Sequence, residues 1–568
     1  MTNNEVLKTD ECPFVISATI VEALQRSAAE SHGRGIAIFD RRGQKSEFHT
    51  YAEILQRATL CAGRLAASGV GPGDRLLVCL PTCWDLIDAL LGSFVIGALP
   101  TLVAPPGALG GAAAHALKIR TLLDLMGSKR FLCDEATRTL LNESGESGAA
   151  ALSLLPGELA GLSPVVGFAR KLATPDDIAF MQLTSGSTGR QRAVMIRHSN
   201  LMANMQAIYA TLGLHPHSRE QRVVSWLPLN HDMGLVGCLL FSIAYGFNLD
   251  LLRPESFLAR PKLWMQLMAG SSITMTPAPN FAYQLCVERV DVADLAGCDL
   301  SHWRTAMTGA EMIRPETCDA FAAKFGPLGF DARAFVPCYG MAEATLAVAA
   351  DMRRAGVKTI PAPQDARSGM GLSKLVSNGT AVLDTTLRIS PSGSANELSD
   401  EQIGEVCVKG PGVFAGYYND PAATAVALQD GWLRTGDLGF LKDGELYITG
   451  RLKDLLIVHG HNIMPHEIEW LAESATGAGG AERCGAFSVA RGAEGEQAVV
   501  VLEISDMDDA ALSALAHDIR SRVGRALGLP LADVVLVKRG QIPKTTSGKV
   551  QRGELRRRYL DNSLERRF

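Results

Sequence analysis

The most informative stretch of the chain is residues 183–198, LTSGSTGRQRAVMIRH. It combines closely spaced hydroxyl side chains with a cation and with two glycines, which allow backbone N–H groups to approach an anion. These features predict a loop that cradles a polyphosphate; an ordinary Ser/Gly-rich turn is the alternative. No G-K-[ST] follows, and the next residues, AVMI, indicate a strand, so the stretch is not a Walker A loop. The candidate phosphate-binding residues are Thr184, Ser185, Gly186, Ser187, Thr188, Gly189 and Arg192.

The sequence around this loop alternates helix-like and strand-like segments, as α/β architecture requires. Residues 176–183 predict a strand that leads into the loop. Earlier in the chain, residues 49–69 have helical periodicity and residues 73–82 predict a short apolar strand. Residues 134–174 are rich in Gly, Ser and Pro, and we expect them to form a surface connection.

Length and composition limit the classes of protein that the chain can belong to. A chain of 568 residues exceeds one core, because cores stop growing at roughly 250–300 residues. Hydrophobic residues make up 47% and charged residues 20%, which excludes disordered and fibrous classes. The 55 basic and 60 acidic residues give a net charge of −5, so no nucleic-acid partner is expected.

Cysteine spacing and apolar stretches indicate a protein of the reducing cytoplasm. The twelve cysteines include no C-x-x-C pair, which favours buried thiols over a zinc site or disulfides. The N-terminus has no signal-peptide pattern. Residues 89–114 carry no charge, but proline and glycine interrupt them. We therefore expect a buried helix, a strand and a glycine-rich turn there, and no membrane span.

The end of the chain predicts a separate, smaller α+β unit. Polar, Gly/Pro-rich sequence occupies residues 348–403, and a new pattern begins after residues 434–454. We place the domain boundary at Leu452–Lys453. The expected elements are helices near 465–475, 508–526 and 552–561, with strands around 486–504 and at 532–538.

Further polar motifs surround the predicted loop in sequence. PLNHDMGLVG (228–237) brings a His-Asp pair into an apolar context, where a buried histidine with only a structural role is an equal alternative. VPCYGMAEATLAV (336–348) offers Tyr339 as a stacking face and Glu343 as a hard oxygen ligand for Mg²⁺. A solvated helix-start carboxylate is the alternative for Glu343. TGAE (308–311) could read a base edge through its backbone.

Two C-terminal motifs complete the set. RTGDLG (434–439) and TGRLKD (449–454) supply Asp437 and Arg451, an acceptor and a cation suited to a ribose or a phosphate. Each could also be a turn residue. IPKTTSGKVQR (542–552) places Lys549 in a Thr/Ser/Gly loop that could enter another domain's cleft, although a lysine in such a loop is usually solvated.

These signals occur in one order along one chain, and in that order the sequence resembles the adenylate-forming superfamily of acyl-CoA synthetases, luciferases and adenylation domains. The likeness spans roughly residues 15–560 and is strongest to fatty acyl-AMP ligases. It implies an α/β fold: a large N-terminal domain (1–452) with two α/β sheets and a small β-barrel, and a mobile α+β domain (453–568). The narrower signature lies in WLPLNHDMGL (226–235), RPESFLARPKLW (253–264), TPAPNFAYQLC (276–286), LSHWRTAMTGAE (300–311) and CYGMAEATLAV (338–348).

The resemblance implies ATP-dependent activation of a fatty or related carboxylic acid to an acyl-AMP, with release of pyrophosphate. It implies the cofactors ATP and Mg²⁺, and then transfer of the acyl group to the pantetheine thiol of an acyl carrier protein. An acyl-CoA synthetase using free coenzyme A is the alternative. A catalytically silent nucleotide- or lipid-binding relative is a more remote one.

The resemblance also implies roles for individual residues. Residues 184–189 and Arg192 would hold the β- and γ-phosphates, and Glu343 would ligate Mg²⁺. Lys549 would bridge the acyl carboxylate and the α-phosphate, and Lys453 would be the hinge. The remaining nucleotide contacts would be Gly309, Ala310, Glu311, Tyr339, Gly340, Met341, Asp437 and Arg451. The acyl pocket would include His231, Met233, Gly234 and Phe281, with His231 beside the reacting carboxylate.

This chain departs from the family pattern in the phosphate loop and at Asn378. The loop contains R-Q-R-A where relatives have x-P-K-G, so Arg192 replaces a lysine, keeping the charge and adding bidentate contact. Residues 343–379 resemble the insertion of the AMP ligases, and Asn378 stands where that group often has cysteine. The tail from Lys549 to Phe568 has seven basic and three acidic residues, suited to an acidic carrier protein or simply to a solvated helix face.

Overall fold

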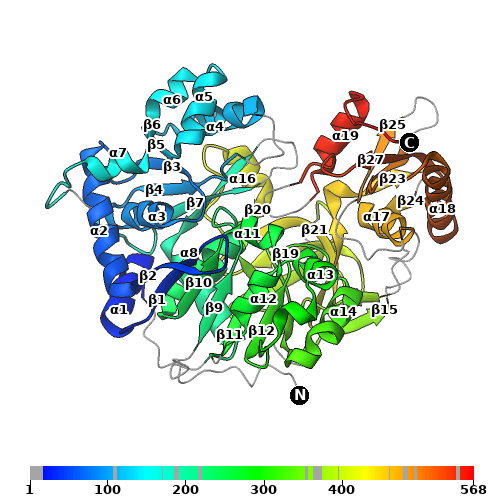
Figure 1. Cartoon of the computed structure of the whole chain (residues 1–568), viewed down its shortest axis with the longest axis horizontal. Coiled ribbons are helices and arrows are strands. Elements are labelled where there is room, and N and C mark those ends of the chain that lie inside the picture. The colour runs from blue at the N-terminus through cyan, green and yellow to red at the C-terminus, as the bar shows by residue number, and fades with distance from the viewer. Residues whose placement is uncertain are drawn as a thin grey trace.

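The structure is a computed structural model of the chain (Figure 1). It describes residues 17–106, 112–168, 171–184, 191–214, 221–270, 272–351, 356–361, 374–394, 396–458, 461–476, 484–490, 496–544 and 550–568. Within these ranges the first 450 residues form three larger sheets and two two-stranded sheets, and a separate three-stranded sheet lies near the C-terminus.

The largest sheet has nine strands in the order β17-β14-β13-β12-β11-β9-β10-β1-β2. The six strands from β13 to β1 run parallel, while β2, β14 and β17 pair antiparallel at the edges. The parallel strands are almost continuously buried, as expected where helices cover both faces. Their bounds are β1 Gly35–Phe39, β2 Lys45–Thr50, β9 Arg222–Ser225, β10 Asn248–Leu252, β11 Thr274–Ala278, β12 Trp303–Thr308, β13 Phe335–Gly340, β14 Ala347–Ala350 and β17 Thr380–Ala381.

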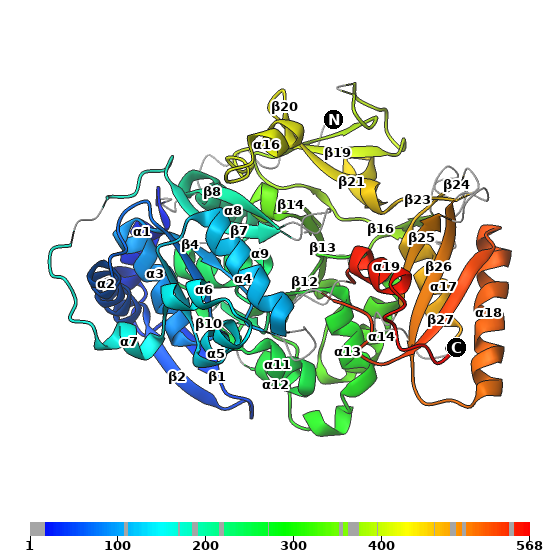
Figure 2. The ribbon, with the colours of Figure 1, turned by 90° about the horizontal axis from the view of Figure 1, so that it is seen from above.

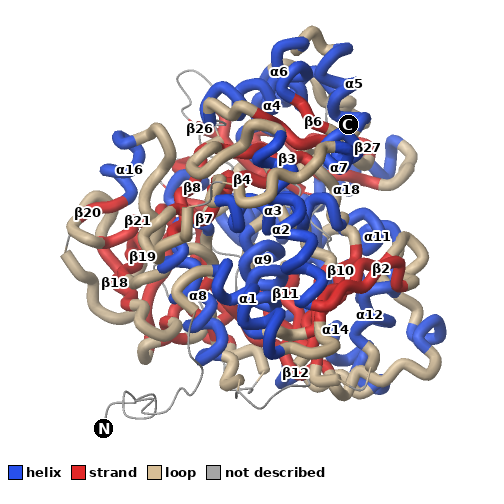
Figure 3. The backbone as a smooth tube through the Cα atoms, turned by 90° about the vertical axis from the view of Figure 1, so that its left-hand side faces the viewer, coloured by secondary structure: helices blue, strands red, loops and turns tan. Residues whose placement is uncertain are grey.

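Helices pack on this sheet (Figure 3), and apolar side chains of the sheet and the helices lie in one buried cluster. Beside β12 and β13, α12, α13 and α14 contribute a cluster of ring contacts that includes Trp264, Tyr283 and Phe321. The helices of this part of the chain are α1 Ile20–Glu30, α2 Tyr51–Ala67, α3 Trp84–Ile96, α8 His198–Thr211, α9 Asp232–Gly234, α10 Phe241–Tyr245, α11 Pro254–Ala259, α12 Lys262–Met268, α13 Asn280–Arg289 and α14 Pro315–Phe325.

A four-stranded parallel sheet, β4-β3-β5-β6, forms the second α/β layer. Its core includes the buried side of α4 together with Met181 and Ala193 of the antiparallel hairpin β7–β8. The hairpin that carries the predicted phosphate loop is therefore anchored on a packed layer. The bounds are β3 Arg75–Cys79, β4 Leu99–Leu102, β5 Arg130–Cys133, β6 Ser153–Leu154, β7 Ile178–Thr184, β8 Arg192–Arg197, α4 Ala112–Met126, α5 Glu135–Glu143, α6 Ser147–Leu152 and α7 Pro156–Gly161.

A five-stranded antiparallel sheet is the third unit and takes the place expected for a small β-barrel. Its strands are β18 Thr386–Ser390, β19 Gly404–Lys409, β20 Leu428–Gln429, β21 Trp432–Lys442 and β22 Glu445–Arg451, accompanied by α16 Pro421–Ala427. A short hairpin, β15 Thr359–Pro361 with β16 Lys374–Val376, lies beside it.

The C-terminal unit, residues 456–568, has its own sheet, β25-β26-β27, and its own apolar clusters. Alternate residues of β26 face opposite sides: Val500 packs with α17 and α18, whereas Val499 packs with α19. Figure 2 shows this unit beside the rest of the molecule. Its bounds are β23 Leu456–Val458, β24 His461–Ile463, α17 Pro465–Ser474, β25 Cys484–Ala490, β26 Glu496–Ile504, α18 Asp509–Leu527, β27 Leu531–Lys538 and α19 Arg552–Leu560.

Most expected elements are confirmed, and one expectation was wrong. Residues 134–174 are not merely a surface connection, because α5, α6 and α7 lie within them. Asp134 starts α5 by accepting a hydrogen bond from the Thr137 amide at 2.9 Å, and Pro156 opens α7. The eleven described cysteines form no disulfide, and no helix among the described residues is long and apolar enough to cross a membrane.

The C-terminal unit contacts the rest of the chain through Arg314, which precedes α14. Its guanidinium donates to Glu473 Oε2 at 2.8 Å and lies 4.7 Å from the centre of the Trp470 ring, both on α17. Side-chain exposure is 18% for Arg314 and 4% for Glu473, so solvent screens this contact weakly. The contact therefore stabilises the observed arrangement of the two parts.

We expect Arg314→Ala to loosen this arrangement, because it removes both the ion pair and the cation–π contact. Hydrogen exchange of the α17 amides should become roughly tenfold faster, corresponding to about 1.4 kcal/mol of lost docking free energy. Arg333→Ala, which removes an exposed pair with Asp331, is the matched control and should change nothing in α17. Unaltered α17 exchange in the Arg314 variant would contradict this account.

Candidate active site

The predicted phosphate loop joins the two strands of the β7–β8 hairpin. Thr184 at the end of β7 pairs with Arg192 at the start of β8, so the hairpin register brings the two ends of the loop together. Residues 185–190 lie outside the described residues; they include the candidates Ser185, Gly186, Ser187, Thr188 and Gly189. Arg192 Nε lies 3.4 Å from Asp420 Oδ2, which fixes one side of the guanidinium.

Glu343 lies in a 3₁₀ turn, Ala342–Ala344, directly after β13. It is partly buried, so the expectation of a solvated helix-start carboxylate does not hold. Its Oε1 accepts a hydrogen bond from the Tyr417 hydroxyl at 2.9 Å. Burial raises the pKa of the Glu343 carboxyl, and the bond from Tyr417 opposes that rise.

Asp437 and Arg451 are directly opposite each other in the β21–β22 ladder. Arg451 Nε donates to Asp437 Oδ1 at 2.7 Å, and the Tyr339 hydroxyl donates to Asp437 Oδ2 at 2.6 Å. Asp437 is only 3% exposed. Burial, followed by the charge of Asp437, raises the pKa of Tyr339 well above its usual value. Three residues predicted separately from the sequence thus form one hydrogen-bonded group.

Close backbone packing explains the glycine at the end of β13. A Cβ added at Gly340 would lie 1.9 Å from the carbonyl oxygen of Leu346, and one at Gly309 would lie 2.6 Å from that of Cys338. Ala310 has a φ of +67°. Met341 continues this turn, its amide donating to Leu346 O at 2.9 Å. The 309–311 segment and the end of β13 therefore lie against each other.

Glu311 has a structural contact that its sequence motif did not indicate. Its Oε1 accepts from the Phe281 amide at 2.6 Å, at the start of α13. This bond ties the 309–311 segment to the helix that carries Phe281. Its Oε2 is buried with no hydrogen-bond partner among the described residues.

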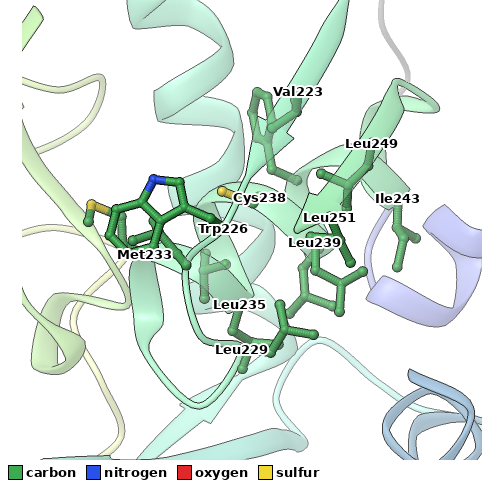
Figure 4. Close-up of a cluster of buried hydrophobic side chains, with 14 of the residues drawn as sticks. Val223, Trp226, Leu229, Met233, Leu235, Cys238, Leu239, Ile243, Leu249 and Leu251 are labelled. Atoms are coloured by element: carbon green, nitrogen blue, oxygen red, sulfur yellow. The ribbon is translucent and has the colours of Figure 1, made fainter. Parts of the chain in front are cut away.

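The HDMG motif begins a short helical segment at the edge of the apolar core. His231 is the N-cap of α9, with Nδ1 lying 2.7 Å from Asp232 Oδ1. A six-residue π-helix, Leu235–Leu240, follows. Figure 4 shows Met233 beside Trp226. Gly234 is packed against Pro228, since an added Cβ would lie 2.5 Å from its carbonyl oxygen.

One cavity of about 2110 Å³ connects these groups. Its lining includes Thr184, Arg192, Tyr339, Gly340, Glu343 and Arg451, and it also includes the apolar side chains of Trp226, Met233, Phe241, Phe281 and Leu285. His231 also lines this cavity. A cavity lined by both charged and apolar side chains suits a ligand that has an anionic part and an apolar part.

The C-terminal unit supplies the remaining wall of the cavity. Lys544 and Gln551 line it, and Gln551 Nε2 donates to Lys544 O at 3.0 Å. They flank the segment containing Lys549, which lies outside the described residues. Lys453, in the turn Leu452–Asp454, also lines the cavity, and burial lowers its pKa.

Sequence reasoning missed Tyr417 and Asp420, which contact Glu343 and Arg192. Both lie in GVFAGYYND (412–420), where a glycine precedes a Tyr-Tyr pair. Tyr417 is 74 positions from Glu343, so no local pattern could have joined them. Asp437 with Arg451, by contrast, could be nominated because each lies in a recognisable turn-like motif.

The family comparison agrees with this geometry. Residues 24–418 match a family described as "AMP-binding enzyme". The chain belongs to this family. A Caulobacter vibrioides protein that carries an acyl-CoA synthetase name is 35% identical over 564 residues, covering 96% of both chains.

Two further similarities concern fatty-acid enzymes. The Long-chain-fatty-acid–AMP ligase FadD28 of Mycobacterium tuberculosis is 32% identical over 549 residues, covering 91% of this chain and 93% of its own. A solved structure from work on fatty acyl-adenylate ligases of E. coli and L. pneumophila aligns with a TM-score of 0.87 and 32% identity, covering 96% of this chain and 98% of that one. The AMP-binding fold of the family is therefore present along nearly the whole chain.

We expect Asp437→Asn to weaken AMP binding by tenfold or more, because hydrogen bonds to a charged group contribute about 1.5–3 kcal/mol. The amide cannot accept from Arg451 and Tyr339 as the carboxylate does. Isothermal titration with AMP measures the effect. Asp331→Asn, at an exposed pair, is the matched control and should bind AMP normally. Unchanged affinity in the Asp437 variant would refute a nucleotide role for this group.

Proposed function

We propose that the protein activates a fatty acid with ATP to an acyl-AMP, releases pyrophosphate, and transfers the acyl group to the pantetheine thiol of an acyl carrier protein. The observation that carries this proposal is one cavity whose lining includes Arg192, Glu343 and Arg451 together with the apolar side chains of Trp226 and Phe281. Membership of the AMP-binding family supports a nucleotide bound beside these charged residues.

The charged and polar residues of the candidate site offer a group for each part of ATP. Asp437 and Arg451 would hold the ribose hydroxyls, and the Tyr339 ring with Gly309 and Ala310 would bind adenine. The loop from Thr184 to Gly189, together with Arg192, would hold the β- and γ-phosphates. The hydroxyl of Tyr339 already donates to Asp437, which fixes the ring relative to the ribose site.

Glu343 fits a magnesium site of the kind that uses substrate phosphates as ligands. No group of three or more His, Cys, Asp or Glu side chains that could hold a metal ion is found among the described residues. Mg²⁺ is commonly held by one or two carboxylates plus phosphate oxygens, which one cavity-lining carboxylate satisfies. When bound, it would neutralise charge on the phosphates.

Adenylation is mainly an electrostatic problem, because two anions must approach each other. A carboxylate oxygen of the acid bonds to the α-phosphorus while the bond from that phosphorus to the bridging oxygen breaks, and pyrophosphate leaves with the electron pair. Arg192 and Lys549 would stabilise the charge on the phosphoryl oxygens. His231 would orient the reacting carboxylate.

The apolar wall supports a fatty substrate. Trp226 is 3% exposed and packs edge-on against Phe281 at 5.9 Å between ring centres. The π-helix contributes Gly237, where an added Cβ would lie 2.9 Å from Leu346. Burial of each methylene on such a wall contributes about 0.8 kcal/mol.

Transfer requires a second arrangement of the C-terminal unit. We place the domain boundary at residues 452–453, with Lys453 as the hinge that withdraws Lys549 after adenylation. A pantetheine thiolate then attacks the acyl carbon, the C–O bond to AMP breaks, and AMP leaves. One apolar cluster ends with Leu446 and another begins with Leu456, and this separation supports the boundary.

The acceptor is the finer part of the proposal. Residues 343–379 support a carrier protein through their likeness to the AMP-ligase insertion, and Asn378 links its surroundings by donating to Cys338 O at 3.3 Å. The acyl-CoA synthetase name of the Caulobacter relative favours free coenzyme A as the second candidate. The basic C-terminal tail gives weaker support for docking of an acidic carrier protein, because Glu554 already pairs with Arg557 and Arg558.

A panel of fatty acids assayed by pyrophosphate release tests the first half-reaction, and carrier protein and coenzyme A compared as acceptors test the second. We expect acid-dependent pyrophosphate release and faster transfer to the carrier protein. Equal rates with coenzyme A would favour the acyl-CoA synthetase. Absence of release with every acid would indicate a catalytically silent nucleotide- or lipid-binding relative.

Lys549→Ala should nearly abolish adenylation, because it removes the cation between the carboxylate and the α-phosphate. Thiol transfer from a supplied acyl-adenylate should remain largely intact. Single-turnover assays of the two steps measure this difference, with Lys538→Ala, an exposed residue at the end of β27, as the control. Equal loss of both steps would contradict the two-arrangement mechanism.

A further inference from the structure

Tyr417 connects two groups that the proposed function assigns to the polyphosphate. The Arg192 guanidinium lies 5.2 Å from the centre of the Tyr417 ring, within cation–π range. The Tyr417 hydroxyl donates to Glu343 Oε1 at 2.9 Å. One side chain therefore contacts the cation at the end of the phosphate loop and the carboxylate after β13.

The backbone around Tyr417 is fixed from both sides. On the β8 side, the Met195 amide donates to Gly416 O at 3.0 Å and the Tyr418 amide donates to Ala193 O at 2.8 Å. On the other side, the Phe414 amide donates to the backbone carbonyl of Glu343 at 2.9 Å. Segment 414–418 thus lies between β8 and the Glu343 turn.

The Tyr417 side chain is held as firmly as its backbone. It is 8% exposed and packs edge-on against Phe414, with ring centres 4.9 Å apart. Its own amide donates to Thr424 Oγ1 at 2.9 Å. A buried residue with few alternative rotamers can fix the positions of the groups that contact it.

Arginine at position 192 suits this contact. A planar guanidinium stacks on an aromatic face, whereas a lysine ammonium is a compact point charge. The Arg192 guanidinium has five N–H donors, and Asp420 lies beside its Nε. The terminal nitrogens can then bind phosphate oxygens while the ring holds the plane of the group.

We propose that Tyr417 is a positioning residue for the polyphosphate end of ATP. Its ring orients Arg192, its hydroxyl orients Glu343, and together they set the spacing between the cation and the carboxylate that hold the phosphates. This inference rests on the proposed function for ATP as the ligand, and it adds a residue and a physical role to that site.

Comparing ATP with AMP separates positioning from a general structural role. Isothermal titration of Tyr417→Phe should show roughly tenfold weaker ATP binding in the presence of Mg²⁺, because the hydroxyl bond to Glu343 is lost. AMP lacks the β- and γ-phosphates and binds at Asp437 and Arg451, so its affinity should not change. Tyr418→Phe, at the next residue, is the matched control and should bind both nucleotides normally.

A double-mutant cycle tests the ring contact. Arg192→Lys keeps the charge but loses planar stacking, so its effect on ATP binding should be smaller in a Tyr417→Leu background than in the wild type. We expect a coupling of about threefold to tenfold. Additive effects would overturn the role of the ring, and Tyr417→Phe remains informative if Tyr417→Leu fails to fold.

The outcomes distinguish this inference from the proposed function. Equal loss of ATP and AMP affinity in Tyr417→Phe, or no loss of either, would overturn the positioning role. If the wild-type protein binds Mg²⁺ and ATP but releases no pyrophosphate with any fatty acid, the proposed function fails. The binding comparison for Tyr417 would still decide its role.

Discussion

The site depends on one buried carboxylate, that of Asp437. It accepts hydrogen bonds from Tyr339, near the end of strand β13 of the nine-stranded sheet, and from Arg451, at the end of β22. It lies itself on β21 of the antiparallel sheet. The Asp437 side chain therefore joins two sheets. Its partner Arg451 directly precedes the turn that contains Lys453. A buried charge with two donors tolerates little displacement, because an unmade bond costs its desolvation.

The cavity follows from this junction. The residues that we propose to bind the nucleotide lie at strand ends and in short turns, where glycines allow backbone segments to approach closely. The apolar wall is built from helices packed on the large sheet, among them the π-helix after His231. Arg314 docks the C-terminal unit through α17, and Lys544 and Gln551 of that unit close one side of the cavity. In the proposed function, movement of the C-terminal unit would exclude water during adenylation and admit a thiol for the transfer step.

Local signals in the sequence predicted much of this fold. The helix at 51–67 has apolar periodicity and a capping box between Thr50 and Glu53, and β26 of the C-terminal unit contains a continuous apolar run. The helices within residues 134–174 were missed, because frequent glycine and serine outweighed the start signals at Asp134 and Pro156. Local composition does not reveal which of these competing preferences tertiary packing will favour.

Glu343, Asp437 and Arg451 could be nominated as candidates from the sequence, because each stands in its own motif. The contacts of Tyr417 and the tie from Glu311 to Phe281 were not, since they depend on packing between distant segments. The pairing of Arg314 with Glu473 spans 159 positions and likewise leaves no trace in a single sequence. Residue identity therefore nominated the candidates, and only the fold showed which of them contact one another.

The central claim is that one cavity holds the adenylate and the acyl chain together. A crystal structure with a hydrolysis-resistant acyl-adenylate analogue, such as an acyl-sulfamoyl adenosine, tests it most directly. The account predicts the ribose against Asp437 and Arg451, and the acyl chain along Trp226 and Phe281. An acyl chain outside this cavity, or a ribose away from Asp437, would contradict it.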